Sequence, residues 1–334
     1  MRLFALVFAL LLAPPQVQAQ SAQSRLDLSP YAGPSRLVDI GGRRLNLLCL
    51  GNGRPTVVFE AQLGEAAWDW APVHAQVSQH TRACIYDRAG LGFSDPSSRP
   101  GTALNAAQDL AELLSRAQEQ PPYLLVGASY GALIARYFAA QHSRQVSGLV
   151  LVDGHHEDEF TRINQLSAGK YAAMMDSMEQ SYRQCAAAAS NHIAPGSAEY
   201  NACVGPPPSF ANRAIAAAHL AQALSTNYWE SALSEWENLN RVSAVQVRAV
   251  NGGLREVPML ALVRSISPFD APGKPASALS VAVEHENTRM QQETAMLSTS
   301  GSIRIIPGAS HAIHLDNPPA VAKAVLDTVA RVRR

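Results

Sequence analysis

A single serine stands between two glycines at the end of an apolar run. The stretch from Pro122 to Ala140, PYLLVGASYGALIARYFAA, contains Gly127-Ala128-Ser129-Tyr130-Gly131, a G-x-S-x-G sequence. The apolar run predicts a strand, and the small-residue pattern that follows predicts a helix. A sharp turn from strand to helix lifts the serine hydroxyl out of the sheet and exposes it to a substrate. We therefore predict that Ser129 is a nucleophile. The alternative is a helix start that is merely rich in small residues.

A serine hydroxyl is a weak nucleophile unless a base takes its proton, and a carboxylate usually holds that base. The stretch IPGASHAIHLDNPPAV places His311 between a strand-like apolar run and the last predicted helix. This position puts His311 at the same edge of the sheet as Ser129. His314 is the alternative base. Asp316 and Asn317, directly before the prolines, are interpreted as helix caps.

Short apolar runs alternate with helical patterns along most of the chain. The predicted strands cover residues 36–40, 45–50, 56–60, 83–87, 123–127, 148–153, 259–264 and 302–306. The predicted helices cover residues 70–79, 103–118, 130–141 and 318–332. Near-continuous apolar strands separated by helices indicate an α/β fold whose parallel sheet is covered on both faces. The glycines at 41 and 42 join the first two strands and favour an antiparallel hairpin.

One region departs from this alternation. Between residues 157 and 255 there is no strand-like run, only Ala-rich helical patterns such as residues 170–190 and 210–224. We interpret this region as a helical insertion over the sheet, with a plain packing module as the alternative. The predicted organisation is a signal peptide at 1–19, a linker at 20–35, a core at 36–156 and 256–334, and the helical insertion at 157–255.

The N-terminal segment has the pattern of a secretory signal. Arg2 is followed by an apolar run from Leu3 to Ala13 and then by Val17-Gln18-Ala19. Cleavage after Ala19 would give an exported protein, periplasmic or secreted; an uncleaved anchor is the alternative. No later segment is apolar and long enough to span a membrane. The net charge of zero gives no electrostatic footprint for nucleic acid.

The chain has four cysteines, an even number that is typical of disulfides in exported proteins. Cys185 and Cys203 lie in one segment of the helical insertion. Cys49 and Cys84 lie on two predicted strands that could be neighbours. We therefore expect the pairs Cys49–Cys84 and Cys185–Cys203, with buried free thiols as the alternative.

Several stretches together resemble a known family. They are GNGRPTVVFEAQLG, ACIYDRAGLGFSD, LLVGASYGALIARYFA, VSGLVLVDGHHED and IPGASHAIHLDNP. The chain resembles the α/β-hydrolases, in particular secreted or periplasmic serine hydrolases with a helical cap. The resemblance runs from about Arg36 to the C-terminus and is weak only in the helical insertion. It implies an eight-stranded, mostly parallel sheet whose second strand is antiparallel, with the nucleophile after the fifth strand and the histidine after the eighth.

The resemblance implies two places for the acid that holds the histidine. Many family members carry it after the seventh strand, but here that strand ends in VRSISPFD, and Asp270 comes several residues later. Others carry it directly after the sixth strand, where this chain has Asp153. We expect Asp153 to be the acid, with Asp270 as the alternative and a loop-capping role for Asp153 as another. His155 and His156 are interpreted as ordinary polar loop residues, with a position facing the cleft as the alternative; a two-His metal site would lack a third ligand.

The resemblance also implies an oxyanion hole made of two backbone amides. One is the amide of Tyr130, directly after the nucleophile. The other comes from the loop after the third strand, where Ala61-Gln62 replaces the usual His-Gly pair and Leu63 becomes the expected donor. Glu60, at the end of that strand, is interpreted as structural.

The loop DRAGLGFSD, from Asp87 to Asp95, is a hallmark of the family. Its glycines permit a tight turn, and Asp87 and Arg88 can hold neighbouring loops through charge-assisted hydrogen bonds. A phosphate-binding loop is excluded because the Walker lysine is missing and the Rossmann spacing does not fit.

These residues predict a carboxylesterase that cleaves small-molecule esters through an acyl-enzyme on Ser129 and needs no cofactor or metal. An amidase or aminopeptidase of the same fold is an alternative, in which Glu230, Glu235 or Glu237 would hold a free amine. A second alternative is a non-catalytic binding protein on a hydrolase scaffold.

Overall fold

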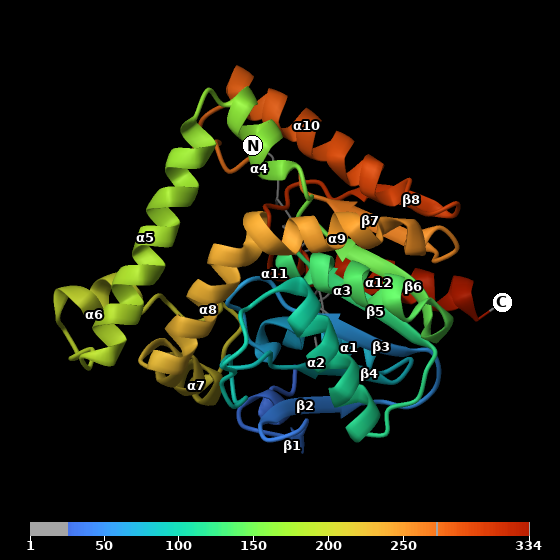
Figure 1. Ribbon diagram of the computed structural model, residues 1–334, viewed down its shortest axis with the longest axis horizontal. Coiled ribbons are helices and arrows are strands. Elements are labelled where there is room, and N and C mark those ends of the chain that lie inside the picture. Colours follow the sequence, from blue (N-terminus) through green and yellow to red (C-terminus); the bar gives the residue numbers. More distant parts are fainter. Residues whose placement is uncertain (1–25, 272, 334) are drawn as a thin grey trace, which may run out of the picture.

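The computed structural model describes residues 26–271 and 273–333 (Figure 1). The predicted signal peptide and the first part of the predicted linker lie outside the described residues. The strands are β1 Arg36–Asp39, β2 Arg44–Leu50, β3 Thr56–Glu60, β4 Ala83–Tyr86, β5 Tyr123–Ala128, β6 Val146–Val152, β7 Met259–Val263 and β8 Gly301–Ile305. Each lies within two residues of a strand predicted from the sequence.

The strands form one eight-stranded sheet in the order β1-β2-β4-β3-β5-β6-β7-β8. β2 runs antiparallel to both of its neighbours, and the other neighbouring strands are parallel. The β1–β2 turn places Gly41 at φ 103° and Gly42 at φ 91°, a region that favours glycine. The predicted α/β fold with a mostly parallel sheet and an antiparallel second strand is confirmed.

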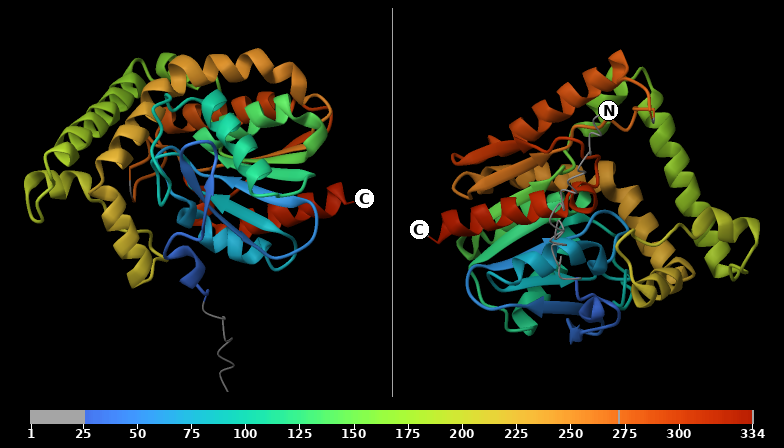
Figure 2. Two further views of the ribbon diagram at one scale, coloured as in Figure 1. Left: turned by 60° about the horizontal axis from the view of Figure 1, so that its bottom comes forward. Right: turned by 180° about the vertical axis from the view of Figure 1, so that it is seen from behind.

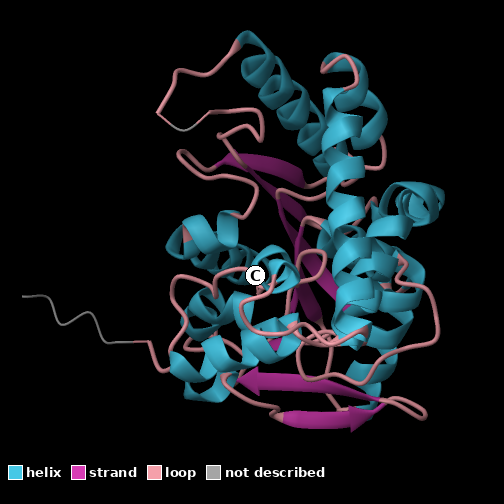
Figure 3. Cartoon of the chain, turned by 90° about the vertical axis from the view of Figure 1, so that its left-hand side faces the viewer, coloured by secondary structure: helices cyan, strands magenta, loops and turns pink. Residues whose placement is uncertain are grey.

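Helices cover both faces of the sheet (Figure 3). On one face pack α2 Ala103–Arg116, α3 Tyr130–Gln141 and α10 Ala278–Ala295, and on the other pack α1 Ala71–Val77 and α12 Pro318–Val332. Seen from behind in Figure 2, α12 lies across the second face. Successive side chains of β3 alternate between the two cores: Val58 joins the first, and Val57 and Phe59 join the second. Burial on both faces explains the near-continuous apolar runs.

Every element between β6 and β7 is helical. They are α4 Glu159–Leu166, α5 Lys170–Ser190, α6 Ala198–Cys203, α7 Arg213–Ala223, α8 Thr226–Asn238, a π-helical turn Leu239–Ser243, α9 Ala244–Val250 and a 3-10 turn Asn251–Leu254. α5 extends away from the sheet towards α6 (Figure 1), and a small separate core forms there around Trp229. Among the described helices, none has both the length and the apolar character to cross a bilayer.

Neither α10 nor the short helix α11 Ile313–Asp316 was predicted from the sequence. α10 buries Val283 and Met290 together with the polar residues Asn287 and Gln291, so it lacks the clean apolar stripe that marks an amphipathic helix. The cap of α12 agrees with the prediction, because the side chain of Asn317 accepts a hydrogen bond from the amide of Ala320 (3.2 Å).

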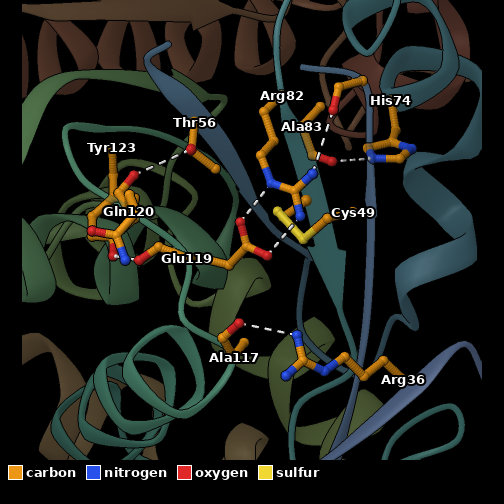
Figure 4. Close-up of a disulfide and its surroundings, with 12 residues drawn as sticks. Arg36, Cys49, Thr56, His74, Arg82, Ala83, Ala117, Glu119, Gln120 and Tyr123 are labelled. Atoms are coloured by element: carbon orange, nitrogen blue, oxygen red, sulfur yellow. Dashed lines mark hydrogen bonds and ion pairs between the residues drawn. A yellow bond between two sulfur atoms is a disulfide. The ribbon is translucent and has the colours of Figure 1, made fainter. Parts of the chain in front are cut away.

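Both expected disulfides are present. Cys49 and Cys84 are directly opposite in the β2–β4 register, and Cys185–Cys203 links α5 to α6. Figure 4 shows Cys49 beside the ion pair of Arg82 with Glu119, whose Nε–Oε2 distance is 2.6 Å. The two sulfurs also lie close to Glu119, but they are bonded to each other and offer no thiolate to a metal ion.

Candidate active site

Ser129 lies at the turn between β5 and α3 in a strained conformation, with φ 50° and ψ −117°. Glycines on either side make this turn possible. A Cβ on Gly127 would lie 2.5 Å from the carbonyl oxygen of Gly131, and a Cβ on Gly131 would lie 2.5 Å from the carbonyl oxygen of Glu60. No larger residue fits either position without moving the backbone. The turn predicted from the G-x-S-x-G sequence therefore has a steric cause in the packing of α3 against β3 and β5.

His311 joins Ser129 to Asp153. Its Nε2 lies 2.9 Å from the Oγ of Ser129, and its Nδ1 lies 2.6 Å from Oδ2 of Asp153. The three residues come from the carboxyl ends of β5 and β6 and from the loop after β8. The parallel strands bring these ends to one edge of the sheet, so residues 158 and 182 positions apart in the chain are in hydrogen-bond contact.

The carboxylate of Asp153 is buried and fully hydrogen-bonded. Besides His311, it accepts hydrogen bonds from Nη1 of Arg264 (2.8 Å), from Nδ2 of Asn287 (3.0 Å) and from the backbone amide of Arg264 (3.3 Å). Burial by itself would raise the pKa of Asp153, but Arg264, His311 and Asn287 outweigh it and hold the pKa below its ordinary value. Asp153 is therefore ionised at neutral pH.

The alternative base and acid lie elsewhere. His314 is buried against Trp70, with ring centroids 4.5 Å apart, and its Nε2 lies 3.2 Å from Oε2 of Glu65. Asp270 accepts a hydrogen bond from the amide of Ser267 (2.9 Å) and closes a local turn. Among the described residues neither side chain is hydrogen-bonded to the nucleophile or to His311. The geometry thus separates the candidates that the sequence left open.

In the loop after β3, the amides on both sides of the Leu63 amide are hydrogen-bonded. The amide of Gln62 donates to Oε2 of Glu65 (3.2 Å), the amide of Gly64 donates to Oε2 of Glu235 (3.0 Å), and the amide of Glu65 donates to the carbonyl of Gln62 (3.2 Å). Within the described part of the chain, the amide of Leu63 has no protein acceptor. Leu63 also lines the cavity that contains Ser129.

Tyr130 is the first residue of α3, and its amide likewise has no acceptor among the described residues. The amides of the first helical turn lack partners within a helix, and the helix dipole makes this end favourable for negative charge. Tyr130 directly follows Ser129, and Leu63 lies in the wall of the cavity. The amides of both residues, the expected oxyanion donors, therefore have no acceptor among the described residues.

A cavity of about 320 Å³ contains Ser129 and His311. One wall comes from α5, which contributes Met174, Met175 and Met178, and Trp236 of α8 lies in another part of the lining. Methionine side chains are flexible and adapt to ligands of different shape. Most of the wall is apolar, with the reactive groups at one side.

His155 lies in the loop after β6 and lines this cavity, in agreement with the alternative that it faces the cleft. Its Nδ1 lies 3.1 Å from Oε2 of Glu159, its Nε2 lies 2.9 Å from Oδ1 of Asn240, and Tyr171 donates to Oε1 of Glu159 (2.7 Å). Burial lowers the pKa of His155, but Glu159, Asn240 and Glu157 together outweigh burial and raise the pKa above its ordinary value. His156 is also buried, and its Nδ1 accepts the amide of Asp158 (3.0 Å).

Two hydrogen-bond partners of Asp153 were not predicted from the sequence. Asn287 lies on the unpredicted helix α10, so no sequence signal could have placed it near Asp153. Arg264 directly follows β7. Its position at the end of a predicted strand was readable in the sequence, but its bond to Asp153 was not.

The model of the alpha/beta hydrolase family matches residues 48–324. The chain belongs to the α/β-hydrolase family, as the resemblance predicted.

Among curated proteins, YqjL of Bacillus subtilis strain 168 is 38% identical over 103 residues, which cover 31% of this chain and 41% of YqjL. YbdG of the same organism is 25% identical over 123 residues, covering 36% of this chain and 38% of YbdG. Both are described as uncharacterized proteins. The chain therefore spans less than half the length of these curated relatives.

Solved structures share the fold at low sequence identity. The enol-lactonase from Burkholderia xenovorans LB400 superposes with a TM-score of 0.58 at 18% identity. The superposition covers 88% of this chain and 100% of the enol-lactonase chain. Cfl2 from Burkholderia cenocepacia superposes with a TM-score of 0.61 at 17% identity. The superposition covers 88% of this chain and 95% of the Cfl2 chain. At such identities the likeness establishes the fold alone.

Proposed function

We propose that this protein is a serine hydrolase that cleaves carboxylic esters through an acyl-enzyme intermediate. One observation carries the proposal: His311 bonds at one nitrogen to Ser129 and at the other to the buried carboxylate of Asp153. A histidine placed between a hydroxyl and a carboxylate serves as general base and then as general acid.

In the first half of the reaction, Nε2 of His311 accepts the proton of Ser129 as Oγ attacks the ester carbonyl carbon. The carbonyl oxygen gains negative charge and is bound by the amides of Tyr130 and Leu63, which have no acceptor among the described residues. Asp153 holds the imidazole in the tautomer that leaves Nε2 free to accept and stabilises the imidazolium that forms. The imidazolium then protonates the departing alkoxide, and an acyl-serine remains.

In the second half, His311 takes a proton from water, the hydroxide attacks the acyl-serine, and Ser129 recovers its proton as the acid departs. The apolar wall with Met174, Met175 and Met178 suits an apolar acyl or alcohol group. No metal or cofactor is used in these steps.

An aminopeptidase activity has less support, because the acids considered for an amine site do not line the cavity of Ser129. Glu235 is bound by Arg88, and Oε1 of Glu237 lies 2.5 Å from Nη2 of Arg183. Glu230 lines a different cavity. A non-catalytic binding role would not require the hydrogen-bonded chain from Ser129 to Asp153.

The test is hydrolysis of a series of p-nitrophenyl esters of increasing acyl length. We expect saturable activity that Ser129→Ala abolishes and that Ser115→Ala, a matched change on the exposed face of α2, leaves intact. A fluorophosphonate probe should label the wild type and Ser115→Ala but not Ser129→Ala. A wild type that neither hydrolyses any ester nor reacts with the probe would refute the proposal.

We also propose that the protein is exported. The disulfides Cys49–Cys84 and Cys185–Cys203 support this, because disulfides persist mainly in oxidising compartments. Fractionation of the producing cells, with thiol labelling before and after reduction, tests it. Free thiols on protein recovered from the cytoplasm would contradict export.

A further inference from the structure

The loop that carries Leu63 is held by two buried charged side chains from different parts of the chain. Arg88, after β4, donates from Nη1 to the carbonyl of Ala61 (2.8 Å) and from Nη2 to the carbonyl of Gln62 (2.7 Å). Glu235, on α8 of the helical insertion, accepts the amide of Gly64 (3.0 Å). The backbone groups on both sides of the Leu63 amide are thus fixed by these two side chains.

Arg88 and Glu235 are bonded to each other in a fork. Nε of Arg88 lies 2.6 Å from Oε1 of Glu235, and Nη2 lies 2.9 Å from Oε2. Both residues are buried, at 5% and 4% exposure. Glu60 is also near, 3.8 Å from Arg88, but burial, which outweighs the attraction of Arg88, raises the pKa of Glu60 to about 8. Glu235 therefore supplies the main counter-charge of Arg88 at neutral pH.

The same arginine also contacts the other expected oxyanion donor. The guanidinium of Arg88 lies over the ring of Tyr130, 5.4 Å from its centroid, a cation–π arrangement. The Arg88–Glu235 pair therefore contacts both the loop that carries Leu63 and the ring of Tyr130, whose amide is the other expected oxyanion donor.

We propose that Glu235 is a positioning residue for the oxyanion hole, through which the helical insertion holds the Leu63 amide at the distance that the reaction requires. This inference rests on the proposed serine-hydrolase function. Glu235 uses Oε2 for both Gly64 and Arg88 and Oε1 for Arg88 alone, so both oxygens and the full length of the side chain are needed. The helical insertion is then part of the catalytic unit and not only a cover over the cavity.

Two substitutions test this role in different ways. Glu235→Gln keeps the shape but has a single acceptor oxygen, which cannot serve Gly64 and both nitrogens of Arg88. Glu235→Asp keeps the charge that compensates the buried Arg88 but is shorter by one methylene, so it cannot span both partners. The second variant remains informative if the first fails to fold, because an unpaired buried charge is strongly destabilising.

The assay compares kcat/KM for an ester and for its thionoester. In the thionoester the negative charge develops on sulfur, which fits a site shaped for oxygen poorly and is stabilised little by the two amides. Removing one oxyanion donor outright costs about 10²- to 10³-fold in rate. For a displaced donor we expect the kcat/KM of the ester to fall about 10- to 100-fold, with a much smaller fall for the thionoester. The ester-to-thionoester ratio of kcat/KM should therefore drop about 10-fold or more in both variants.

Glu157→Gln is the matched control. Glu157 forms a buried two-pronged pair with Arg136, with Nη1–Oε2 and Nη2–Oε1 distances of 2.8 and 3.0 Å, away from the Leu63 loop. It should lower thermal stability yet keep the wild-type ester-to-thionoester ratio. An active wild type whose ratio is unchanged in Glu235→Gln and Glu235→Asp, or falls equally in Glu157→Gln, overturns the positioning role alone. A wild type inactive on both substrates overturns the serine-hydrolase proposal itself.

Discussion

Replacing Asp153 by asparagine should damage the site in a way that depends on Arg264. In the native site, Oδ2 of Asp153 lies between Nδ1 of His311 (2.6 Å) and Nη1 of Arg264 (2.8 Å). The guanidinium is also close to the imidazole itself, with Nη1 3.4 Å from Nδ1. Asparagine keeps the shape and removes the charge. The imidazolium that forms when Ser129 attacks then faces Arg264 without the carboxylate that separates them.

The size of the effect follows from this geometry. At an effective dielectric constant of about 20, two unit charges 3.4 Å apart repel each other by about 5 kcal/mol. Glu284, 3.2 Å from Nε of Arg264, compensates part of that charge. The loss of the correct imidazole tautomer acts in the same direction. We therefore expect the kcat/KM of Asp153→Asn to fall about 10³- to 10⁴-fold.

The assay is kcat/KM for the best ester of the acyl-length series, with thermal unfolding of each variant as a check on folding. Asp270→Asn is the control, because within the described part of the chain the Asp270 carboxylate is hydrogen-bonded only at the Ser267 turn, and it should change kcat/KM less than about threefold. The double variant Asp153→Asn with Arg264→Gln removes the unbalanced charge and should recover about 10-fold or more over Asp153→Asn. If Asp153→Asn stays within about 10-fold of the wild type, or if the double variant recovers nothing, the electrostatic argument is wrong.

Gly131→Ala should lower kcat by more than about 10²-fold, because the new Cβ would meet the carbonyl oxygen of Glu60 at 2.5 Å and displace the Tyr130 amide. Gly252→Ala is the control in the ester assay, because nothing lies within 4 Å of its Cβ. A fully active Gly131→Ala would contradict the steric account. Glu157→Gln should lower the free energy of unfolding by about 3 kcal/mol at pH 7. Burial raises the pKa of Glu157, but Arg136 and His156 together outweigh burial and lower the pKa from 4.5 to about 2. This contribution to the free energy of unfolding is present above the unfolded-state pKa and is lost as pH falls from 4.5 to about 2. The urea midpoints of wild type and variant should therefore differ at pH 7 and converge near pH 2. A difference that stays constant with pH would refute this link between the pKa and stability.

The elements of the fold were predictable wherever burial left a simple pattern. Strands such as β5 and β6 are apolar on both faces, since helices cover the sheet on both sides, and their runs stand out in the sequence. α10 was not predictable, because Asn287 and Gln291 face the interior and bond to the site and its neighbouring backbone. A helix that buries polar groups for such contacts does not show the apolar period on which prediction depends.

The sequence by itself determined that Ser129 stands at a strand-to-helix turn, that a histidine follows the last strand, and which cysteines lie where they can pair. These are local properties, fixed by residue type and by the order of neighbouring elements along the chain. Only the tertiary structure decided that Asp153 rather than Asp270 contacts His311, that Arg264 shares this carboxylate, and that Glu235 contacts Gly64 across 171 positions of sequence. Contacts of this kind depend on how strand ends and helices meet in space, and a charged residue in a sequence does not reveal which opposite charge will be buried beside it.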